Sequence, residues 1–286
     1  MDTIHILQSE LNPIETTGHS SKGNQLKWHI DKYWYKADGF GYEGLAETVV
    51  SRLLSMSTVQ NYVKYEPVQI EWRKHVFDGC RSKHFLEGDS QIITVEKLFR
   101  KHTGLSLAEE MGHMAEVTSR IKLLTDFVSG VTGLDDFGEY LATMIEIDAF
   151  FWNEDRHTNN ICVLYSPSER SYSLCPYFDH GASLFSDITG DYPLYKSVEE
   201  CEETIEAKPF ASSFDEQLDA VYSLFHGSLK FSVKRKQLLA EWNKIRLEDA
   251  KNHPDNPKRE QIHMRIDEIL RMQIRKFDYM TGDSFP

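Results

Sequence analysis

The sequence predicts an α+β protein with a small β-rich N-terminal lobe, residues 1–102, and a larger helical C-terminal lobe, residues 103–286. Two observations carry this prediction. Apolar residues in the first third mostly alternate as in strands, whereas those in the remainder mostly recur every three to four residues as in helices. The pattern changes near residues 99–104, which marks the junction between the lobes.

The elements of the first lobe follow from this periodicity. Alternating apolar and aromatic residues at 26–30 and 33–36, separated by a short turn, predict a β-hairpin. A stripe of apolar residues four apart predicts a helix over 42–54. Further strands are expected at 68–72 and 90–95.

The second lobe has one β interruption in a helical pattern. Helical spacing continues over 134–148, and two short β segments at 161–165 and 172–178 flank turn residues. The last helix presents apolar residues between 262 and 277 at core-facing spacing, with charges between them.

Composition sets limits on function. The 286 residues are 40 % hydrophobic and 27 % charged, which is typical of globular chains, and the net charge of −13 disfavours a general nucleic-acid binder. We find no apolar run of membrane-spanning length, no signal-peptide pattern and no Cys-x-x-Cys pair. A cytoplasmic location is therefore expected, with export by a route without a signal peptide left open.

The most informative stretch is Asp-Arg-His-Thr-Asn-Asn at 155–160, followed by Asp-His-Gly at 179–181. The turn of the hairpin between them is centred near 168–170, which predicts that Asn160 and Asp179 lie side by side at its open end, with Asp155 on the adjoining loop. Phosphoryl transfer uses such a set, because one carboxylate accepts the proton of the attacking hydroxyl while a carbonyl oxygen and a second carboxylate hold Mg²⁺.

Two other interpretations of this stretch are open. Loops rich in Asn and Asp are commonly only turns, although the interval from Asp155 to Asn160 is that of the protein-kinase catalytic loop. Asp155 and His157 could instead bind a transition metal, but no third His or Cys stands nearby at ligand spacing.

Other residues of the sequence are candidates for binding the nucleotide. A loop before the first hairpin is rich in glycine and small hydroxyl residues, as expected where backbone N–H groups cover phosphates. Its candidate residues are Gly18, Ser20, Ser21, Lys22 and Gly23. Lys36, at the end of the hairpin, is placed to contact ATP phosphates, and Glu47 in the following helix is placed to pair with it. Glu43, one turn earlier, competes for that pairing.

The adenine site is expected between the lobes. The candidate hinge is residues 94–99, which includes Glu96, Lys97 and Leu98. Backbone groups of Glu96 and Leu98 are expected to hydrogen-bond the adenine edge.

The order of these motifs over residues 17–185 resembles the HipA-like Ser/Thr protein kinases, which share the phosphatidylinositol-kinase-like fold. Residues 20–28 and 42–47 resemble the short, stand-alone, CtkA-like branch of that family, and residues 95–100 resemble the hinge of HipA proteins. The resemblance implies a bilobal protein-kinase-like fold, with an ATP-binding N-terminal lobe and a catalytic C-terminal lobe.

The resemblance also assigns roles. It implies Asp155 as the catalytic aspartate, Asn160 and Asp179 as Mg²⁺ ligands, Lys36 as the ATP-phosphate lysine and His157 as a histidine near the γ-phosphate. Ser20 or Ser21 is a candidate for autophosphorylation. Residues 207–217 are candidates to border the substrate groove, with a plain surface loop as the alternative.

The function expected is an ATP- and Mg²⁺-dependent Ser/Thr protein kinase that acts on a protein of unknown identity. A lipid or small-molecule kinase is a second possibility, disfavoured by the net charge of −13. A third is an ATP-binding pseudokinase scaffold, disfavoured because Lys36, Asp155, Asn160 and Asp179 are all present. We expect no direct nucleic-acid binding and no membrane span.

Overall fold

The computed structural model describes residues 1–6 and 25–282. The chain forms two compact units, each built from segments that are separate in the sequence. The first unit comprises Met1–His84, Phe178–Ile205 and Lys230–Pro286, and the second comprises Phe85–Tyr177 and Glu206–Leu229. The chain first passes from one compact unit to the other at residues 84–85. The functional boundary expected between residues 102 and 103 is a different kind of division and stays a prediction.

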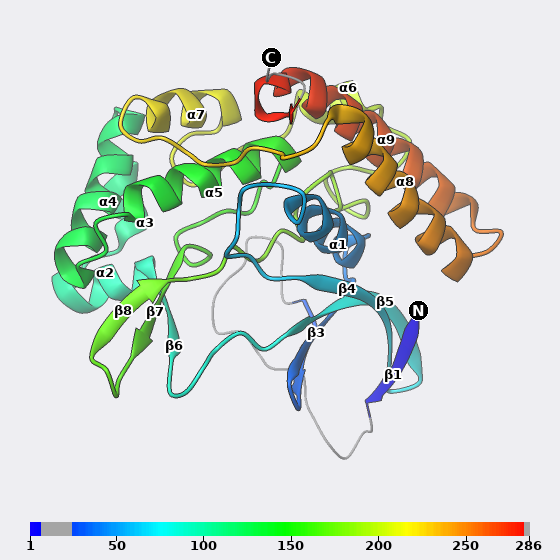
Figure 1. Ribbon diagram of the computed structural model, residues 1–286, viewed down its shortest axis with the longest axis horizontal. Coiled ribbons are helices and arrows are strands. Elements are labelled where there is room, and N and C mark those ends of the chain that lie inside the picture. The colour runs from blue at the N-terminus through cyan, green and yellow to red at the C-terminus, as the bar shows by residue number, and fades with distance from the viewer. Residues whose placement is uncertain (7–24, 283–286) are drawn as a thin grey trace. The chain divides into compact units, whose positions relative to one another are not determined.

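The first unit contains a five-stranded sheet with the order β1-β4-β5-β3-β2 (Figure 1). β1 is parallel to β4, and every other neighbouring pair is antiparallel. The strands are β1 (Asp2–Ile6), β2 (Lys27–Ile30), β3 (Tyr33–Ala37), β4 (Tyr65–Trp72) and β5 (His75–Lys83). The hairpin predicted over 26–36 is therefore present as β2 and β3.

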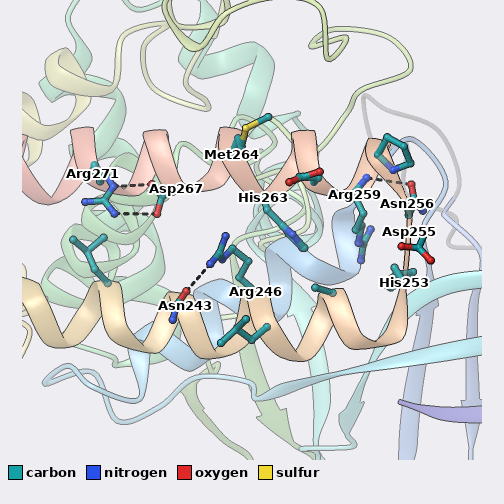
Figure 2. Close-up of a pocket in the computed structure, with 15 residues that line it drawn as sticks. Asn243, Arg246, His253, Asp255, Asn256, Arg259, His263, Met264, Asp267 and Arg271 are labelled. Carbon is teal, nitrogen blue, oxygen red and sulfur yellow. Dashed lines mark hydrogen bonds and ion pairs between the residues drawn. The ribbon is translucent and has the colours of Figure 1, made fainter.

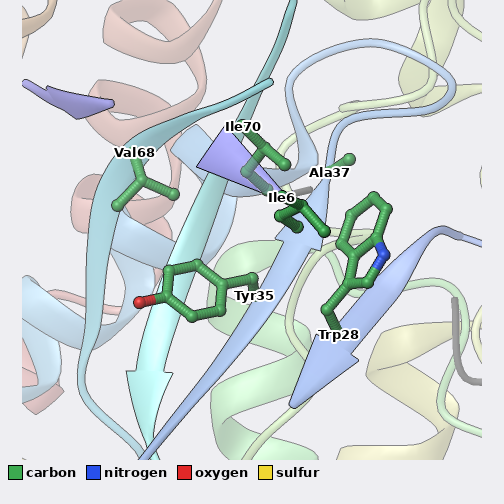
Figure 3. Close-up of a cluster of buried hydrophobic side chains, with 6 residues drawn as sticks. All are labelled: Ile6, Trp28, Tyr35, Ala37, Val68 and Ile70. Atoms are coloured by element: carbon green, nitrogen blue, oxygen red, sulfur yellow. The ribbon is translucent and has the colours of Figure 1, made fainter. Parts of the chain in front are cut away.

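Alternation along these strands separates two faces of the sheet. One face carries a cluster of buried apolar side chains, drawn in Figure 3: Ile6, Trp28, Tyr35, Ala37, Val68 and Ile70. Trp28 lies directly opposite Tyr35 in the β2–β3 register. Lys36 is the next residue along β3, so its side chain lies on the other face.

Helix α1 (Glu43–Leu54) packs against that sheet at very short range. A Cβ added at Gly44 would lie 2.5 Å from the carbonyl carbon of Gly79 on β5, and one added at Gly79 would lie 2.1 Å from the carbonyl oxygen of Lys36. Contacts this short exclude any side chain at either position. The two glycines thus bring α1 and the backbone of Lys36 against the same point of β5.

The long C-terminal helices also belong to the first unit. α8 (Arg235–Asn252) contacts α1 and α9 (Pro257–Lys276), and the short α6 (Val198–Glu202) contacts α9. A 3₁₀ turn, Asp278–Met280, ends this part of the fold. The apolar stripe predicted for the last helix is buried: Ile262, Ile266, Ile269, Leu270, Ile274 and Phe277.

A buried charge cluster joins α8, α9 and β5. Asp249 accepts hydrogen bonds from Arg259 and His263, each at 2.7 Å, and His253 Nε2 lies 2.9 Å from Asp78 Oδ2. Figure 2 shows His253, Arg259 and His263 around a cavity of about 880 Å³ between the two helices. Hydrogen bonds to Asp249 and then to Asp78 raise the pKa of His253 to about 10. Burial raises the pKa of Asp249, but its hydrogen bonds from His253, His263 and Arg259 outweigh burial and lower it.

Stability is therefore expected to fall at alkaline pH. The His253 side chain is 8 % exposed and its folded pKa lies above the ordinary 6.5, so its contribution is full below pH 6.5 and is lost as pH rises through about 10. The free energy of unfolding, measured by urea titration, should decline across this window by up to about 1.4 kcal/mol per pH unit.

The variant His253→Gln should flatten that decline, whereas His75→Gln, at an exposed position on β5, should keep it. An unchanged slope in His253→Gln would show that the alkaline loss has another origin. A separate loss at acid pH is expected from Asp249, because its lowered pKa gives a contribution that is present above its ordinary pKa and disappears as pH falls.

The second unit is mostly helical (Figure 1). Its helices are α2 (Val95–Thr103), α3 (Leu107–Gly112), α4 (Val117–Thr132), α5 (Phe137–Phe151) and α7 (Phe214–Tyr222). α5 contacts α4 and α7 and is buried at nearly every position, which explains its almost continuously apolar sequence. An antiparallel sheet with the order β6-β7-β8 completes the unit, with strands Gln91–Thr94, Cys162–Ser166 and Ser171–Leu174.

The hairpin after the Asp-Arg-His motif is present, but its predicted register is wrong by two residues. Val163 pairs with Leu174 and Ser166 pairs with Ser171, so the hairpin is centred between residues 168 and 169. Extending that register would place Asn160 opposite residue 177, not 179. The pairing also stops at Val163, so the ladder itself does not align Asn160 with Asp179.

No helix within residues 1–6 and 25–282 combines the length and the apolar character needed to cross a bilayer.

Candidate active site

In the first unit, a buried lysine binds two carboxylates. Lys36 Nζ lies 2.6 Å from Glu47 Oε1 and 2.7 Å from Asp179 Oδ1. Lys36 is 9 % exposed and Glu47 is 1 % exposed. Burial lowers the pKa of Lys36, but the charges of Asp179 and then Glu47 outweigh it and raise that pKa well above its ordinary value. Lys36 is therefore a permanent cation at neutral pH.

The structure decides between the two glutamates in favour of Glu47. Glu43 accepts hydrogen bonds from the backbone N–H groups of Gly39, Phe40 and Gly41 at 2.7–3.0 Å, so it stabilises the turn before α1. Glu47 lies one helical turn further along, on the side that faces Lys36. The Lys36–Glu47 ion pair is thus present as the spacing predicted.

Asp179 is fixed in an unusual backbone conformation. Its φ of 64° lies in the left-handed region, which costs free energy for a residue other than glycine. The next residue, His180, donates its backbone N–H to Glu47 Oε2 at 2.9 Å. Glu47 therefore binds both Lys36 and the segment that carries Asp179, and these contacts hold the Asp179 carboxylate on Lys36.

An aromatic group that sequence reasoning missed lies on the same face of the sheet as Lys36. His29 lies opposite Trp34, and their rings stack with centroids 4.8 Å apart. Trp34 Nε1 donates to His84 Nδ1 at 2.9 Å, and the His84 ring lies 4.6 Å from His29. Alternation along the hairpin was the available signal, because Trp34 and Lys36 are two residues apart on β3.

In the second unit, a buried arginine organises the Asp-Arg-His loop. Arg156 is 1 % exposed and forms a bidentate pair with Asp148, the Nε–Oδ2 and Nη2–Oδ1 distances being 2.7 and 3.0 Å. Asn153 donates to the same carboxylate, and Arg156 also donates to the backbone carbonyl of Asn160. The role of Arg156 did not follow from the sequence pattern, because its partner Asp148 lies near the end of α5.

The same loop places three of the predicted site residues together. Asn160 Nδ2 donates to the backbone carbonyl of Asp155 at 3.0 Å, which leaves Asn160 Oδ1 as the acceptor atom of that amide. His157 Nε2 lies 3.9 Å from Asp155 Oδ2, and Lys208 Nζ lies 3.6 Å from Oδ1. Asp155 is thus a carboxylate flanked by a lysine and an imidazole, and it is suited to accept a proton from a hydroxyl group.

Residues 94–99, the candidate hinge, begin at the end of β6 and continue as helix α2, and their contact with adenine stays a prediction. α2 begins at Val95 because the Thr94 side chain caps it by accepting from the Lys97 N–H, and the Glu96 N–H donates to the Thr158 carbonyl. These two N–H groups are therefore engaged within the second unit. The Glu96 carboxylate is engaged there as well, with Thr158 Oγ1 at 3.0 Å, and Leu98 is buried in the helix.

Several predicted residues lie outside the described residues: Gly18, Ser20, Ser21, Lys22 and Gly23. Asn160 and Asp179 belong to different compact units, so their joint role as Mg²⁺ ligands stays a prediction. Both offer hard oxygen donors of the kind Mg²⁺ prefers, so the donor types fit that ion. Within the described ranges, His, Cys, Asp and Glu form no cluster of three or more arranged to hold a metal.

Comparison with solved structures establishes the fold. The structure resembles that of the Helicobacter pylori proinflammatory kinase CtkA, with a TM-score of 0.59 and 16 % identity over 94 % of this chain and 95 % of that one. A HipA chain from a Shewanella oneidensis MR-1 complex of HipA, HipB and operator DNA gives a TM-score of 0.48 at 11 % identity, over 85 % of this chain and 58 % of that one. No protein-family model and no curated protein matches the sequence. The predicted α+β, bilobal kinase-like fold, and the resemblance to CtkA at the level of fold, are confirmed.

Proposed function

We propose that this protein is an ATP- and Mg²⁺-dependent Ser/Thr protein kinase. The observation that carries the proposal is the buried Lys36–Glu47 ion pair with the Asp179 carboxylate on the same ammonium group. A lysine–glutamate pair beside a metal-binding aspartate is what a kinase needs in place before transfer. The Asp155 loop and the CtkA-like fold support the proposal independently.

The first unit supplies groups for binding the nucleotide. Lys36 carries its charge at any physiological pH, so it attracts the α- and β-phosphates electrostatically. The rings of His29, Trp34 and His84 lie on the same face of the sheet and offer an aromatic surface to the adenine base. This surface is a second candidate for contact with the base, beside the predicted hinge at 94–99.

The second unit supplies the group that accepts a proton. In the proposed reaction the acceptor hydroxyl oxygen attacks the γ-phosphorus, the bond from that phosphorus to the ADP oxygen breaks, and the hydroxyl proton passes to Asp155. Arg156 and Asp148 hold the loop in place, and Asn160 Oδ1 and the Asp179 carboxylate are the groups that would bind Mg²⁺. When bound, the ion neutralises phosphate charge.

Radiolabelled ATP with Mg²⁺ tests the proposal. We expect label to pass to protein serine or threonine, either on the chain itself or on a peptide mixture, and mass spectrometry should identify the modified residues, with Ser20 and Ser21 as the candidate autophosphorylation sites. Label that passes only to added phosphoinositide vesicles or to a small metabolite would favour the second candidate function. ATP binding with no turnover on any acceptor would identify a pseudokinase.

A further inference from the structure

A pocket of about 230 Å³ lies beside the Asp155 loop within the second unit. Four parts of the chain form it: α3, the start of α4, the Asp155 loop and the loop after residue 205 that contains Lys208. Its lining residues are Ala108, Met111, Gly112, Arg120, His157, Thr158, Lys208 and Pro209. We call it the acceptor pocket.

The wall made by residues 207–217 is anchored, so it is not a loose surface loop. Ala207 N–H donates to the Ser212 carbonyl at 2.7 Å, and Phe210 N–H donates to Gln217 Oε1 at 2.9 Å. Arg120 ties the same segment to α4, because its guanidinium donates to the Phe210 carbonyl as well as to a carbonyl before α4. Phe210 and Gln217 are both buried.

The pocket adjoins the carboxylate that would accept the substrate proton. Lys208, a wall residue, lies 3.6 Å from Asp155 Oδ1, and His157, another wall residue, lies 3.9 Å from Oδ2. Consecutive Cα atoms of a peptide are about 3.8 Å apart, so a residue next to one whose hydroxyl lies at Asp155 can reach this pocket.

The residues that line the pocket indicate which kind of side chain it would accept from that neighbouring substrate residue. Ala108, Met111 and Pro209 present apolar surface, while the ionisable residues that line the pocket are Arg120, Lys208 and His157, with no carboxylate among them. A lysine or arginine side chain would meet like charge there, and the nearby carboxylates of Asp155 and Glu96 are already in contact with the wall residues Lys208, His157 and Thr158. The volume is below the roughly 300 Å³ at which pockets begin to hold a drug-sized ligand, so it suits one side chain.

We propose that the acceptor pocket binds an apolar side chain of about the size of leucine or methionine, adjacent to the phosphorylated Ser or Thr of a protein substrate, and rejects Lys and Arg at that position. This inference rests on the proposed function, because it names the substrate class of the same site.

The chain offers a matched pair of variants for the test. Gly112 lines the pocket, is exposed, and a Cβ added there meets nothing within 4 Å, so Gly112→Leu adds a side chain to the pocket without displacing the protein. Gly130 on α4 is equally exposed, and a Cβ added there likewise meets nothing within 4 Å, but it is not among the lining residues. Gly130→Leu is therefore the control.

The experiment uses Ser- and Thr-centred peptide arrays in which each flanking position is fixed in turn, together with ATP hydrolysis in the absence of peptide. At one flanking position the wild type should phosphorylate Leu, Met or Val peptides about tenfold or more better than Lys or Arg peptides. Gly112→Leu should lose that preference through a higher KM for peptide, with unchanged ATP hydrolysis, and Gly130→Leu should behave as the wild type.

Two results overturn the proposal. In the first, the wild type phosphorylates peptides with no apolar preference or prefers Lys or Arg. In the second, Gly112→Leu keeps the preference of the wild type. Neither result contradicts the proposed kinase function. Absence of any transfer to peptide or protein by the wild type contradicts the proposed function, and with it the role proposed for the acceptor pocket.

Discussion

Replacing Asp155 by Asn is expected to lower phosphoryl transfer by about 10²–10⁴-fold, the usual contribution of a general acid or base. The amide keeps the size of the side chain and the backbone carbonyl that accepts from Asn160, but it cannot take up the proton of the acceptor hydroxyl. Nucleotide affinity should stay close to that of the wild type, because the loss concerns proton transfer. Radiolabel transfer under single-turnover conditions and titration with a fluorescent ATP analogue measure the two quantities.

Asp126→Asn is the matched control for this prediction. Asp126 lies on α4 with its side chain 63 % exposed, in an ion pair with Lys122 that solvent screens. This variant should transfer phosphate at the wild-type rate. Retention of full activity in Asp155→Asn would remove the assigned role of Asp155, and an equal loss in both variants would point to a general effect of the substitution.

Elements with one dominant periodicity were predictable from the sequence. The helix at 42–54 has apolar residues at regular helical spacing, although all of α1 except Arg52 is buried. The last helix has the same regular spacing, and the hairpin of β2 and β3 follows from simple alternation. The pairing of Lys36 with Glu47 also followed, because β3 and α1 are adjacent in the chain and the short contact between Gly44 and Gly79 holds the helix against the sheet. Local spacing determines these features.

Features set by individual backbone angles were not predictable. The β7–β8 turn contains Arg170 with a φ of 53°, a left-handed conformation that no glycine marks, so the centre of the hairpin was misplaced.

The start of α2, in contrast, did carry a signal in the sequence, since Thr94 stands as an N-cap with Glu96 in the first turn and basic residues in the last. That signal was interpreted as the end of a strand.

Contacts between distant segments account for the rest. The proximity of Lys208 to Asp155 depends on Arg120 and Gln217, which fix the loop after residue 205 from two other helices. The aromatic group of His29, Trp34 and His84 likewise needs β5 beside β3. No local periodicity encodes either arrangement.

Replacing Lys36 by Met is expected to destabilise the protein by about 3–5 kcal/mol and to remove ATP binding. The loss of stability is this large because Glu47 is 1 % exposed and would keep a buried charge without its cation. Burial already raises the pKa of the Glu47 carboxyl, which shows that its charged form is costly there. Asp179, with a side chain 24 % exposed, is better able to regain solvent. Lys83→Met, at an exposed position on β5, is the control and should change stability by less than about 0.5 kcal/mol.

The double variant Lys36→Met/Glu47→Gln separates the structural role of the ion pair from its function. Gln is neutral and keeps a carbonyl oxygen to accept the N–H of His180, so most of the lost stability should return in urea titrations. ATP binding should not return, because the cation that attracts the phosphates is still missing. Recovery of both properties in the double variant would show that Lys36 serves only the fold, whereas recovery of stability alone is the result expected of a lysine that binds nucleotide.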